Sequence, residues 1–246
     1  MAGHNKWSKI KRKKEAKDIK KGASLAKLSK KIILAVKNGE ENLKNNSKLR
    51  TAVEEAKAAG MAKATIDNAI KKASGSQGKS DLKEVLYEGY LPGGVALMIF
   101  TATDNLKRTV QDIKYILSRS EGNLGNSGCV SYLFNKVAYT FIKKPENWNQ
   151  ELEEELLSII LNLGADDFIL EQEKIIISSS PEVSDDLNNT LIDNPKFTII
   201  EVKIVMEASN NIEITDDSTI ELIHKAINQL ENHEDILEVF TNHTEV

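Results

Sequence analysis

The sequence is short of cysteine and long hydrophobic runs, and these shortages argue against several classes of protein. Its 246 residues include one cysteine, which cannot form an intramolecular disulfide and argues against a disulfide-stapled secreted domain. The longest apolar runs, such as residues 95–100, are far shorter than the roughly 20 residues that cross a bilayer. The basic N-terminus lacks the apolar segment of a signal peptide. We therefore expect a soluble, cytoplasmic protein, and the 40% hydrophobic content is enough for packed cores.

The net charge of −4 conceals an uneven distribution along the chain. Residues 1–80 hold 21 basic and 7 acidic side chains, a net of +14, which leaves 12 basic and 30 acidic side chains, a net of −18, for residues 81–246. Residues 1–31 alone hold 12 basic and 2 acidic side chains, a net of +10. A solvated Lys-rich surface is one interpretation. We favour a basic module that binds a polyanion, followed by an acidic body.

Residues 1–73 contain no proline and have the apolar periodicity of helices. Ser24 and Ser47 are the expected N-caps of the second and third helices. Glycine is expected to end helices, at Gly22 for the first and at Gly60 for the third. Such short amphipathic helices indicate a compact bundle. The expected helices cover residues 6–21, 24–38, 47–59 and 62–73.

Beyond a Gly/Ser-rich linker at residues 74–80, short strands alternate with helices. Residues 131–207 have the order β-α-β-β-α-β, which is that of a ferredoxin-like domain. The β-β-α pattern before this segment and the α-β pattern after it are each incomplete, so we expect them to combine. The predicted fold is α+β, an N-terminal helical bundle followed by two ferredoxin-like α+β domains, one inserted into the other. The expected domains are 1–80, 81–130 with 208–246, and 131–207.

Turn and capping residues set the expected bounds of individual elements in this α+β part. Pro92 and the two glycines after it form a turn between the first two strands, and Gly164 ends a helix. The expected helices cover residues 104–118, 149–163, 183–192 and 216–230. The expected strands cover residues 85–90, 95–103, 131–134, 137–142, 168–170, 175–178, 197–206 and 236–241.

Lysines recur every three or four residues in the first basic segment and so share one helix face. Such a face neutralises phosphates, which gives affinity with a strong salt dependence. Lysine reads base edges poorly, and no helix-turn-helix recognition helix is evident, so the sequence predicts phosphate contact. Trp7 either stacks on a base or, as we favour, packs this segment onto the bundle. The candidate nucleic-acid-binding residues are Lys6, Trp7, Lys9, Lys11, Arg12, Lys13, Lys14, Lys17, Lys20, Lys21, Arg50, Lys57, Lys63, Lys71 and Lys72.

No catalytic, metal or nucleotide site is predicted. The stretch at residues 75–80 has Ala73 where a P-loop needs its first glycine, and it follows a helix instead of a strand. Cys129 has no histidine near it in sequence and is expected to be a small buried residue. His4 alone is no metal site, because nothing supplies three further ligands at a recognisable spacing. We therefore expect a non-enzymatic protein without a metal, a cofactor or a small-molecule substrate.

Four segments of the chain resemble the YebC/PmpR family. They are MAGHNKWSKIK at residues 1–11, YEGYLPGGVA at 87–96, TDNLKRT at 103–109 and GNLG at 122–125. The resemblance covers essentially the whole chain and implies a helical N-terminal domain, two α+β domains and no enzymatic activity. Bacterial members are described as cytoplasmic DNA-binding transcriptional regulators. Other members, including a mitochondrial translational activator, act on translation, and some are linked to ribosomes stalled at proline-rich stretches.

The sequence departs from the family's pattern in two loops. Relatives commonly have Asn-Met-Pro where this chain has Gly60-Met61-Ala62, and the loop at residues 39–47 is rich in Asn instead of Gly and Pro. Two hypotheses remain open. The first is a DNA-binding transcriptional regulator acting through the Lys-rich N-terminal domain. The second is a translation factor bound to the ribosome or its RNA, with no membrane partner in either case.

Overall fold

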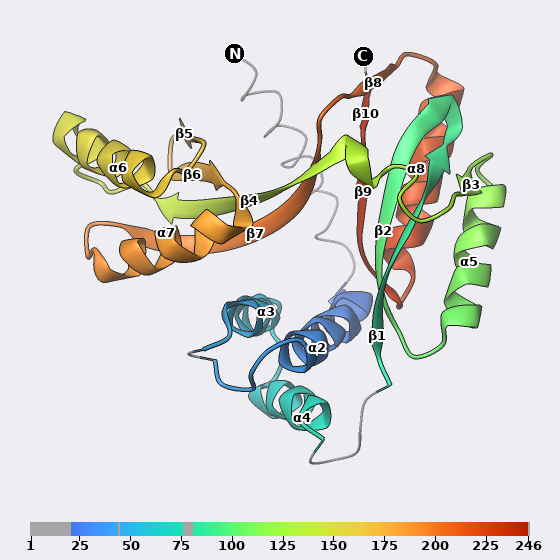
Figure 1. Cartoon of the computed structure of the whole chain (residues 1–246), viewed down its shortest axis with the longest axis horizontal. Helices are drawn as coiled ribbons and strands as arrows, with labels where there is room; N and C mark the ends of the chain where they lie inside the picture. The colour runs from blue at the N-terminus through green and yellow to red at the C-terminus, as the bar shows by residue number, and fades with distance from the viewer. Residues whose placement is uncertain (1–20, 44, 76–80, 246) are drawn as a thin grey trace. The chain divides into compact units, whose positions relative to one another are not determined.

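The computed structural model describes residues 21–43, 45–75 and 81–245 of the chain (Figure 1). Helices and sheets both contribute to it, so the fold is mixed α+β. One compact unit is Asn135–Glu207, and the described residues before and after that segment form the other. No helix in the described ranges is long and apolar enough to cross a membrane.

Three helices form a bundle at the start of the described chain (Figure 1). They meet through their apolar faces in one core that includes Ile32, Leu49 and Ile66, as expected for apolar residues at helical spacing. The first of them, Lys21–Lys37, packs against both of the others. These helices are α2 (Lys21–Lys37), α3 (Ser47–Ala58) and α4 (Lys63–Ala73).

Two of the boundaries predicted for the bundle are wrong. Gly22 and Ser24 lie inside α2, so the first does not end a helix and the second is not an N-cap. A glycine inside a helix costs only about 1 kcal/mol, which packing can offset. Asn46, not Ser47, caps α3, and its side-chain oxygen accepts the Leu49 N–H at 3.0 Å. Its amide also donates to a carbonyl of α2 at 2.8 Å, so this one side chain both caps α3 and ties it to α2.

A four-stranded sheet in the order β3-β1-β2-β9 belongs to the same unit as the bundle. The antiparallel hairpin of β1 (Lys83–Leu91) and β2 (Val95–Thr103) turns through Pro92–Gly94, and β9 (Ile236–Thr241) pairs with β2. α5 (Leu106–Ser118) and α8 (Asp217–Asn232) bury their apolar faces on this sheet. That core includes Leu97, Ile99, Ile113, Ile223 and Val239.

Three very short strands complete this unit, and none of them was predicted. The two-residue β3 (Asn123–Leu124) pairs with β1. β8 (Ile212–Ile214) and β10 (His243–Glu245) form a separate parallel ribbon. Strands of two or three residues are too short to show the alternation on which a sequence prediction depends.

The unit Asn135–Glu207 has the chain order β-α-β-β-α-β and the sheet order β5-β6-β4-β7. The third strand of this order lies between the first two, as in a split βαβ motif. Its two helices and the sheet share a core that includes Ile142, Leu156, Ile175 and Leu187. The elements are β4 (Phe134–Lys143), α6 (Gln150–Leu163), β5 (Asp167–Leu170), β6 (Lys174–Ser179), α7 (Pro181–Asp193) and β7 (Thr198–Ala208).

The strand predicted at residues 131–134 is wrong over most of its length. Ser131–Leu133 is a 3-10 turn, and the strand β4 begins at Phe134. The backbone N–H groups of Val130 and Ser131 donate to the Glu88 carboxylate at 2.8 Å. They are therefore not available for a strand ladder.

Candidate nucleic-acid interface

Most of the predicted nucleic-acid-binding residues lie outside the described ranges. For Lys21 only the backbone, at the start of α2, is described. The basic segment therefore stays a prediction from sequence. The residues outside the described ranges are Lys6, Trp7, Lys9, Lys11, Arg12, Lys13, Lys14, Lys17 and Lys20.

The other five predicted residues lie on two helices of the bundle. Arg50 and Lys57 belong to α3, and Lys63, Lys71 and Lys72 belong to α4. Arg50 is half-buried, whereas the four lysines are exposed. Lys57, Lys63 and Lys72 form no ion pair within the described part of the chain. Their positive charge is thus available to an external anion.

The chain between α3 and α4 makes a tight turn that fixes how the two helices follow one another. Gly60 has a φ of +83° and its N–H donates to the Lys57 carbonyl at 2.9 Å. The Met61 N–H donates to the Ala56 carbonyl at 2.9 Å, and the Met61 side chain is buried in the bundle core. This is a Schellman motif, which favours glycine at the left-handed position. The glycine in this departure from the family's pattern therefore has a structural reason.

The solvent face of α4 carries polar side chains at helical spacing. Thr65, Asn68 and Lys72 are all exposed and are separated by three and then four residues, so they form one stripe. Thr and Asn side chains both donate and accept hydrogen bonds, and an Asn amide can pair with an adenine edge. Sequence analysis missed Thr65 and Asn68 because it searched for positive charge. No local signal distinguishes these two residues, because exposed polar side chains occur on any solvated helix.

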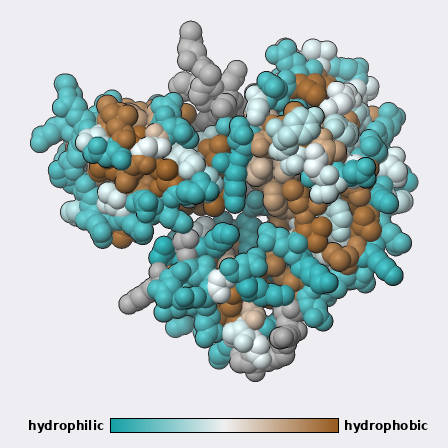
Figure 2. All heavy atoms as spheres, viewed as in Figure 1, coloured by the Kyte–Doolittle hydropathy of each residue, from teal (hydrophilic) through white to brown (hydrophobic). Residues whose placement is uncertain are grey.

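The described lysines of α2 differ from those of α3 and α4, because they bind groups within their own unit. Lys30 Nζ is 2.6 Å from Asp235 Oδ1, and Lys31 Nζ is 2.8 Å from Glu238 Oε1. Lys27 Nζ donates to a backbone carbonyl of α8 at 2.6 Å. These contacts tie the bundle to the neighbouring sheet and helix. The outward positive charge of the described bundle is consequently on α3 and α4, and hydrophilic side chains cover most of its visible face (Figure 2).

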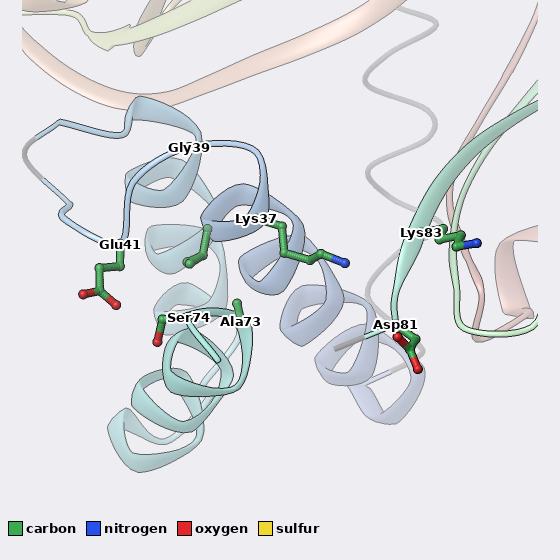
Figure 3. Close-up of a pocket in the computed structure, with 8 residues that line it drawn as sticks. Lys37, Gly39, Glu41, Ala73, Ser74, Asp81 and Lys83 are labelled. Atoms are coloured by element: carbon green, nitrogen blue, oxygen red, sulfur yellow. The ribbon is translucent and has the colours of Figure 1, made fainter. Parts of the chain in front are cut away.

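An open hollow of about 670 Å³ lies where the bundle meets the start of β1 (Figure 3). Lys37 extends from α2 toward Asp81 and Lys83, whereas Glu41 and Ser74 lie on the opposite side (Figure 3). Lys37 Nζ donates to a backbone carbonyl of this segment at 2.8 Å. The lining mixes two basic with two acidic side chains. It therefore offers no field of one sign that would select a ligand, and we do not assign it as the site.

Cys129 lies in the loop before β4 and is half-buried. Burial and the nearby Glu88 carboxylate raise the pKa of its thiol. A raised pKa keeps the thiol protonated, whereas a nucleophilic cysteine needs the thiolate. The Cys129 carbonyl accepts a hydrogen bond from the Tyr90 hydroxyl at 3.0 Å. The surroundings of this residue are those of a structural cysteine.

Sequence comparison assigns the chain to a family. The N-terminal domain of TACO1/YebC proteins matches residues 5–76, and the second and third domains of the same proteins match residues 82–243. The chain belongs to the TACO1/YebC family. A probable transcriptional regulatory protein of Syntrophomonas wolfei is 41% identical over 98% of this chain and 96% of its own length. The probable transcriptional regulatory protein YrbC of Bacillus subtilis is 36% identical over 99% of both chains.

A solved structure shows the same fold. The crystal structure of a conserved hypothetical protein, Aq1575, from Aquifex aeolicus is 35% identical to this TACO1/YebC protein. The two superpose with a TM-score of 0.77 over 93% of this chain and 92% of the other.

The TDNLKRT segment of this TACO1/YebC protein surrounds one buried carboxylate. Asp235, whose side chain is 0% exposed, accepts hydrogen bonds from Arg108 and Thr109, each at 2.8 Å. The Thr103 hydroxyl lies 3.3 Å from the same oxygen. Lys30 of the bundle binds the other oxygen. Asp235, in the loop before β9, thus links this segment and α5 to the bundle. The segment therefore contributes to the packing of the unit.

The YEGYLPGGVA and GNLG segments meet around Glu88. This side chain is 3% exposed, and its carboxylate accepts the backbone N–H groups of Gly128, Val130 and Ser131 at 2.7 to 2.8 Å. Burial alone would raise the pKa of Glu88, but these donors outweigh it and lower the pKa. A side chain at Gly89 would collide with the Asn123 carbonyl, so the strand contact requires glycine there. The contacts of these two segments fix the conformation of the loop before β4.

We expect Glu88→Gln to lower the free energy of unfolding by about 2 kcal/mol, because an amide offers one acceptor where the carboxylate uses two. The amide NH₂ would face backbone N–H groups and leave donors unpaired. Hydrogen exchange of residues 126–131, together with urea unfolding, measures the effect. Glu84→Gln is the matched control, since Glu84 is an exposed carboxylate on the same strand. Equal exchange in the two variants would contradict the role given to Glu88.

Proposed function

We propose that this protein is a non-enzymatic, nucleic-acid-binding regulator of gene expression, and specifically a DNA-binding transcriptional regulator acting through its Lys-rich N-terminal domain. The observation that carries the proposal is the placement of charge on the bundle. The described α2 lysines bind groups within the unit, whereas Lys57, Lys63 and Lys72 of α3 and α4 are exposed and form no ion pair in the described ranges. The names of the bacterial relatives agree with a regulatory role.

The α3–α4 pair suggests how duplex DNA would be bound. Two helices joined by four residues that include a glycine have the connectivity of a helix-turn-helix. In that arrangement α4 would lie in the major groove, with Thr65 and Asn68 near base edges. Lys63 and Lys72 would contact phosphates and supply affinity without sequence preference. The basic segment at residues 6–21 would add further phosphate contacts.

A second candidate function is a translation factor bound to the ribosome or to ribosomal RNA, including ribosomes stalled at proline-rich stretches. It is favoured by the acidic body, because residues 81–246 carry a net charge of −18. A body of that charge is repelled by the DNA backbone but complements basic ribosomal proteins. Lysines on α3, α4 and residues 6–21 would then contact RNA phosphates.

The arrangement of the chain fits either function. We propose three domains, residues 1–80, 81–130 with 208–246, and 131–207, with the last inserted into the second as a ferredoxin-like domain. The first would bind nucleic acid in the cytoplasm. The two α+β domains would carry contacts to other proteins.

A competition experiment distinguishes the two functions. The full-length protein is sedimented with purified ribosomes across a salt series, with and without a mixed-sequence DNA duplex as competitor. Our proposal predicts that the duplex displaces the protein from ribosomes at physiological salt. Retention on ribosomes that the duplex cannot displace would overturn the DNA proposal in favour of translation. Binding to neither would contradict both.

The predicted role of α4 has its own test in two matched variants. Asn68→Ala is expected to relax base preference at one position by about 1–3 kcal/mol while leaving the salt dependence unchanged. Lys72→Gln is expected to weaken binding to all sequences and to reduce the salt slope by about 1. Selection of duplexes from a random pool, followed by titration of the selected sequence, measures both. If Asn68→Ala leaves the selected sequence unchanged, α4 does not read bases.

A further inference from the structure

Two imidazoles and one carboxylate converge beside the C-terminal ribbon. His224 comes from α8, whereas His243 and Glu245 come from β10. β10 pairs in parallel with β8, with His243 opposite Ile212 and Glu245 opposite Ile214. Residues two apart on a strand point to the same face. The ribbon therefore presents both β10 side chains on one side, where His224 meets them.

The distances in this cluster suit one metal ion. His224 Nε2 is 2.6 Å from Glu245 Oε1, and His243 Nε2 is 3.7 Å from that same oxygen. One ligand atom from each residue lies within 4.8 Å of the other two. Zinc bonds of about 2.0–2.2 Å in tetrahedral geometry separate neighbouring ligand atoms by roughly 3.3 Å. The separations of 2.6 and 3.7 Å bracket that value, so small side-chain rotations would seat an ion.

A second contact orients one of the imidazoles. His243 Nδ1 lies 2.8 Å from the Thr241 hydroxyl. When Nδ1–H donates to this oxygen, the lone pair of Nε2 is left facing His224 and Glu245. Metal-bound histidines typically have such a partner on the other ring nitrogen, which fixes the tautomer. Exposure decreases from His224 at 50% through Glu245 at 36% to His243 at 12%, so an ion could reach the cluster from solvent.

We propose that His224, His243 and Glu245 form a binding site for a divalent transition-metal ion, with zinc as its preferred occupant. Two imidazoles and a carboxylate are a known zinc ligand set, and the fourth position would be open to water or to a partner's side chain. The ion would cross-link β10 to α8. This site is independent of the proposed nucleic-acid interface. Sequence analysis expected no metal site, and the three ligands are spread over 22 residues.

Zinc titration of the full-length, untagged, metal-free protein tests the proposal by calorimetry, with thermal unfolding as a second readout. We expect one zinc ion per chain and a higher unfolding midpoint when zinc is present. His224→Ala and Glu245→Gln should each weaken binding by at least the roughly 10-fold that loss of a mere supporting group costs. Both side chains are partly exposed, so these variants should fold, and circular dichroism checks that they do.

His4→Ala is the matched control, because it removes an imidazole that supplies none of the three proposed ligands. It should bind zinc as the unmodified protein does. Three outcomes would overturn the proposal: no zinc binding at equimolar concentration, unchanged binding in both cluster variants, or loss of binding in His4→Ala alone. In the first outcome the cluster is an ordinary hydrogen-bonded contact between histidine and glutamate.

Discussion

Asp235→Ala is expected to destabilise the unit that contains the bundle and the β3-β1-β2-β9 sheet by roughly 3 kcal/mol, since breaking a buried ion pair costs about that much. The carboxylate is fully buried and binds Lys30, Arg108 and Thr109 at 2.6 to 2.8 Å. Its removal takes away the one acceptor that two cations and a buried hydroxyl share. A change of 3 kcal/mol corresponds to roughly a 100-fold change in an equilibrium constant.

Hydrogen exchange measures this loss segment by segment, which suits a protein with two compact units. Amides of α5 and β9 should exchange about 100-fold faster in Asp235→Ala, because they share the equilibrium that the ion pairs stabilise. Glu234→Ala is the matched control, since it removes the same charge from the adjacent, exposed residue. If the two variants exchange alike, the Asp235 contacts do not hold this unit together.

The same contacts make stability depend on pH. Burial alone would raise the pKa of Asp235, but hydrogen bonds from Lys30, Arg108 and Thr109 hold its pKa well below the usual range. The unfolded state therefore takes up a proton first as the pH falls. The contribution is fully present well above the unfolded value of about 3.9 and is lost as the pH falls below it toward the folded value. Asp235→Asn should lack this part of the acid sensitivity.

Changing Lys13, Lys17 and Lys20 together to Glu is expected to reduce nucleic-acid affinity by more than about 100-fold at physiological salt. The triple change reverses six units of charge on a segment whose lysines share one predicted helix face. The fold is expected to stay intact, because lysine side chains are rarely buried in a core, and circular dichroism checks that it does. Fluorescence anisotropy with a labelled duplex, and sedimentation with ribosomes, measure the loss for either partner.

The control for this experiment makes the same change of charge elsewhere on the chain. Lys107, Lys114 and Lys143 are exposed in the α+β part, and changing all three to Glu makes the chain equally more acidic. This control should bind within a few-fold of the unmodified protein at 0.15 M salt, where distant charges are screened. Equal losses in the two triple variants would show that net charge, not the N-terminal segment, determines binding.

Elements set by local patterns were predicted closely from sequence. The strand expected at residues 236–241 is β9, and the helix expected at 149–163 is α6, which is capped by Asn149 and ends at Gly164. Apolar periodicity and caps are local features, so a single sequence displays them. Where two neighbouring residues could both cap a helix, as at Asn46 and Ser47, a contact to α2 decided between them.

Features that depend on distant residues were not predictable in this way. Asp235 is 127 residues from Arg108, and no local sequence pattern at either position predicts that they pair. His224 and Glu245 meet only because α8 lies against the C-terminal ribbon.

For the proposed interface, sequence analysis named the exposed lysines of α4 but not the Thr65–Asn68 stripe beside them. Exposed polar residues at helical spacing are ordinary on any solvated helix.

Cross-linking of the full-length protein to nucleic acid, followed by mass spectrometry of the linked peptides, tests the central claim most directly. A photoreactive duplex and ribosomes are used in parallel, so that the result does not depend on which nucleic acid is the partner. We predict that linked peptides fall within residues 6–21, α3 and α4. Linked peptides confined to residues 81–245 would contradict the claim that the helical N-terminal domain is the nucleic-acid interface.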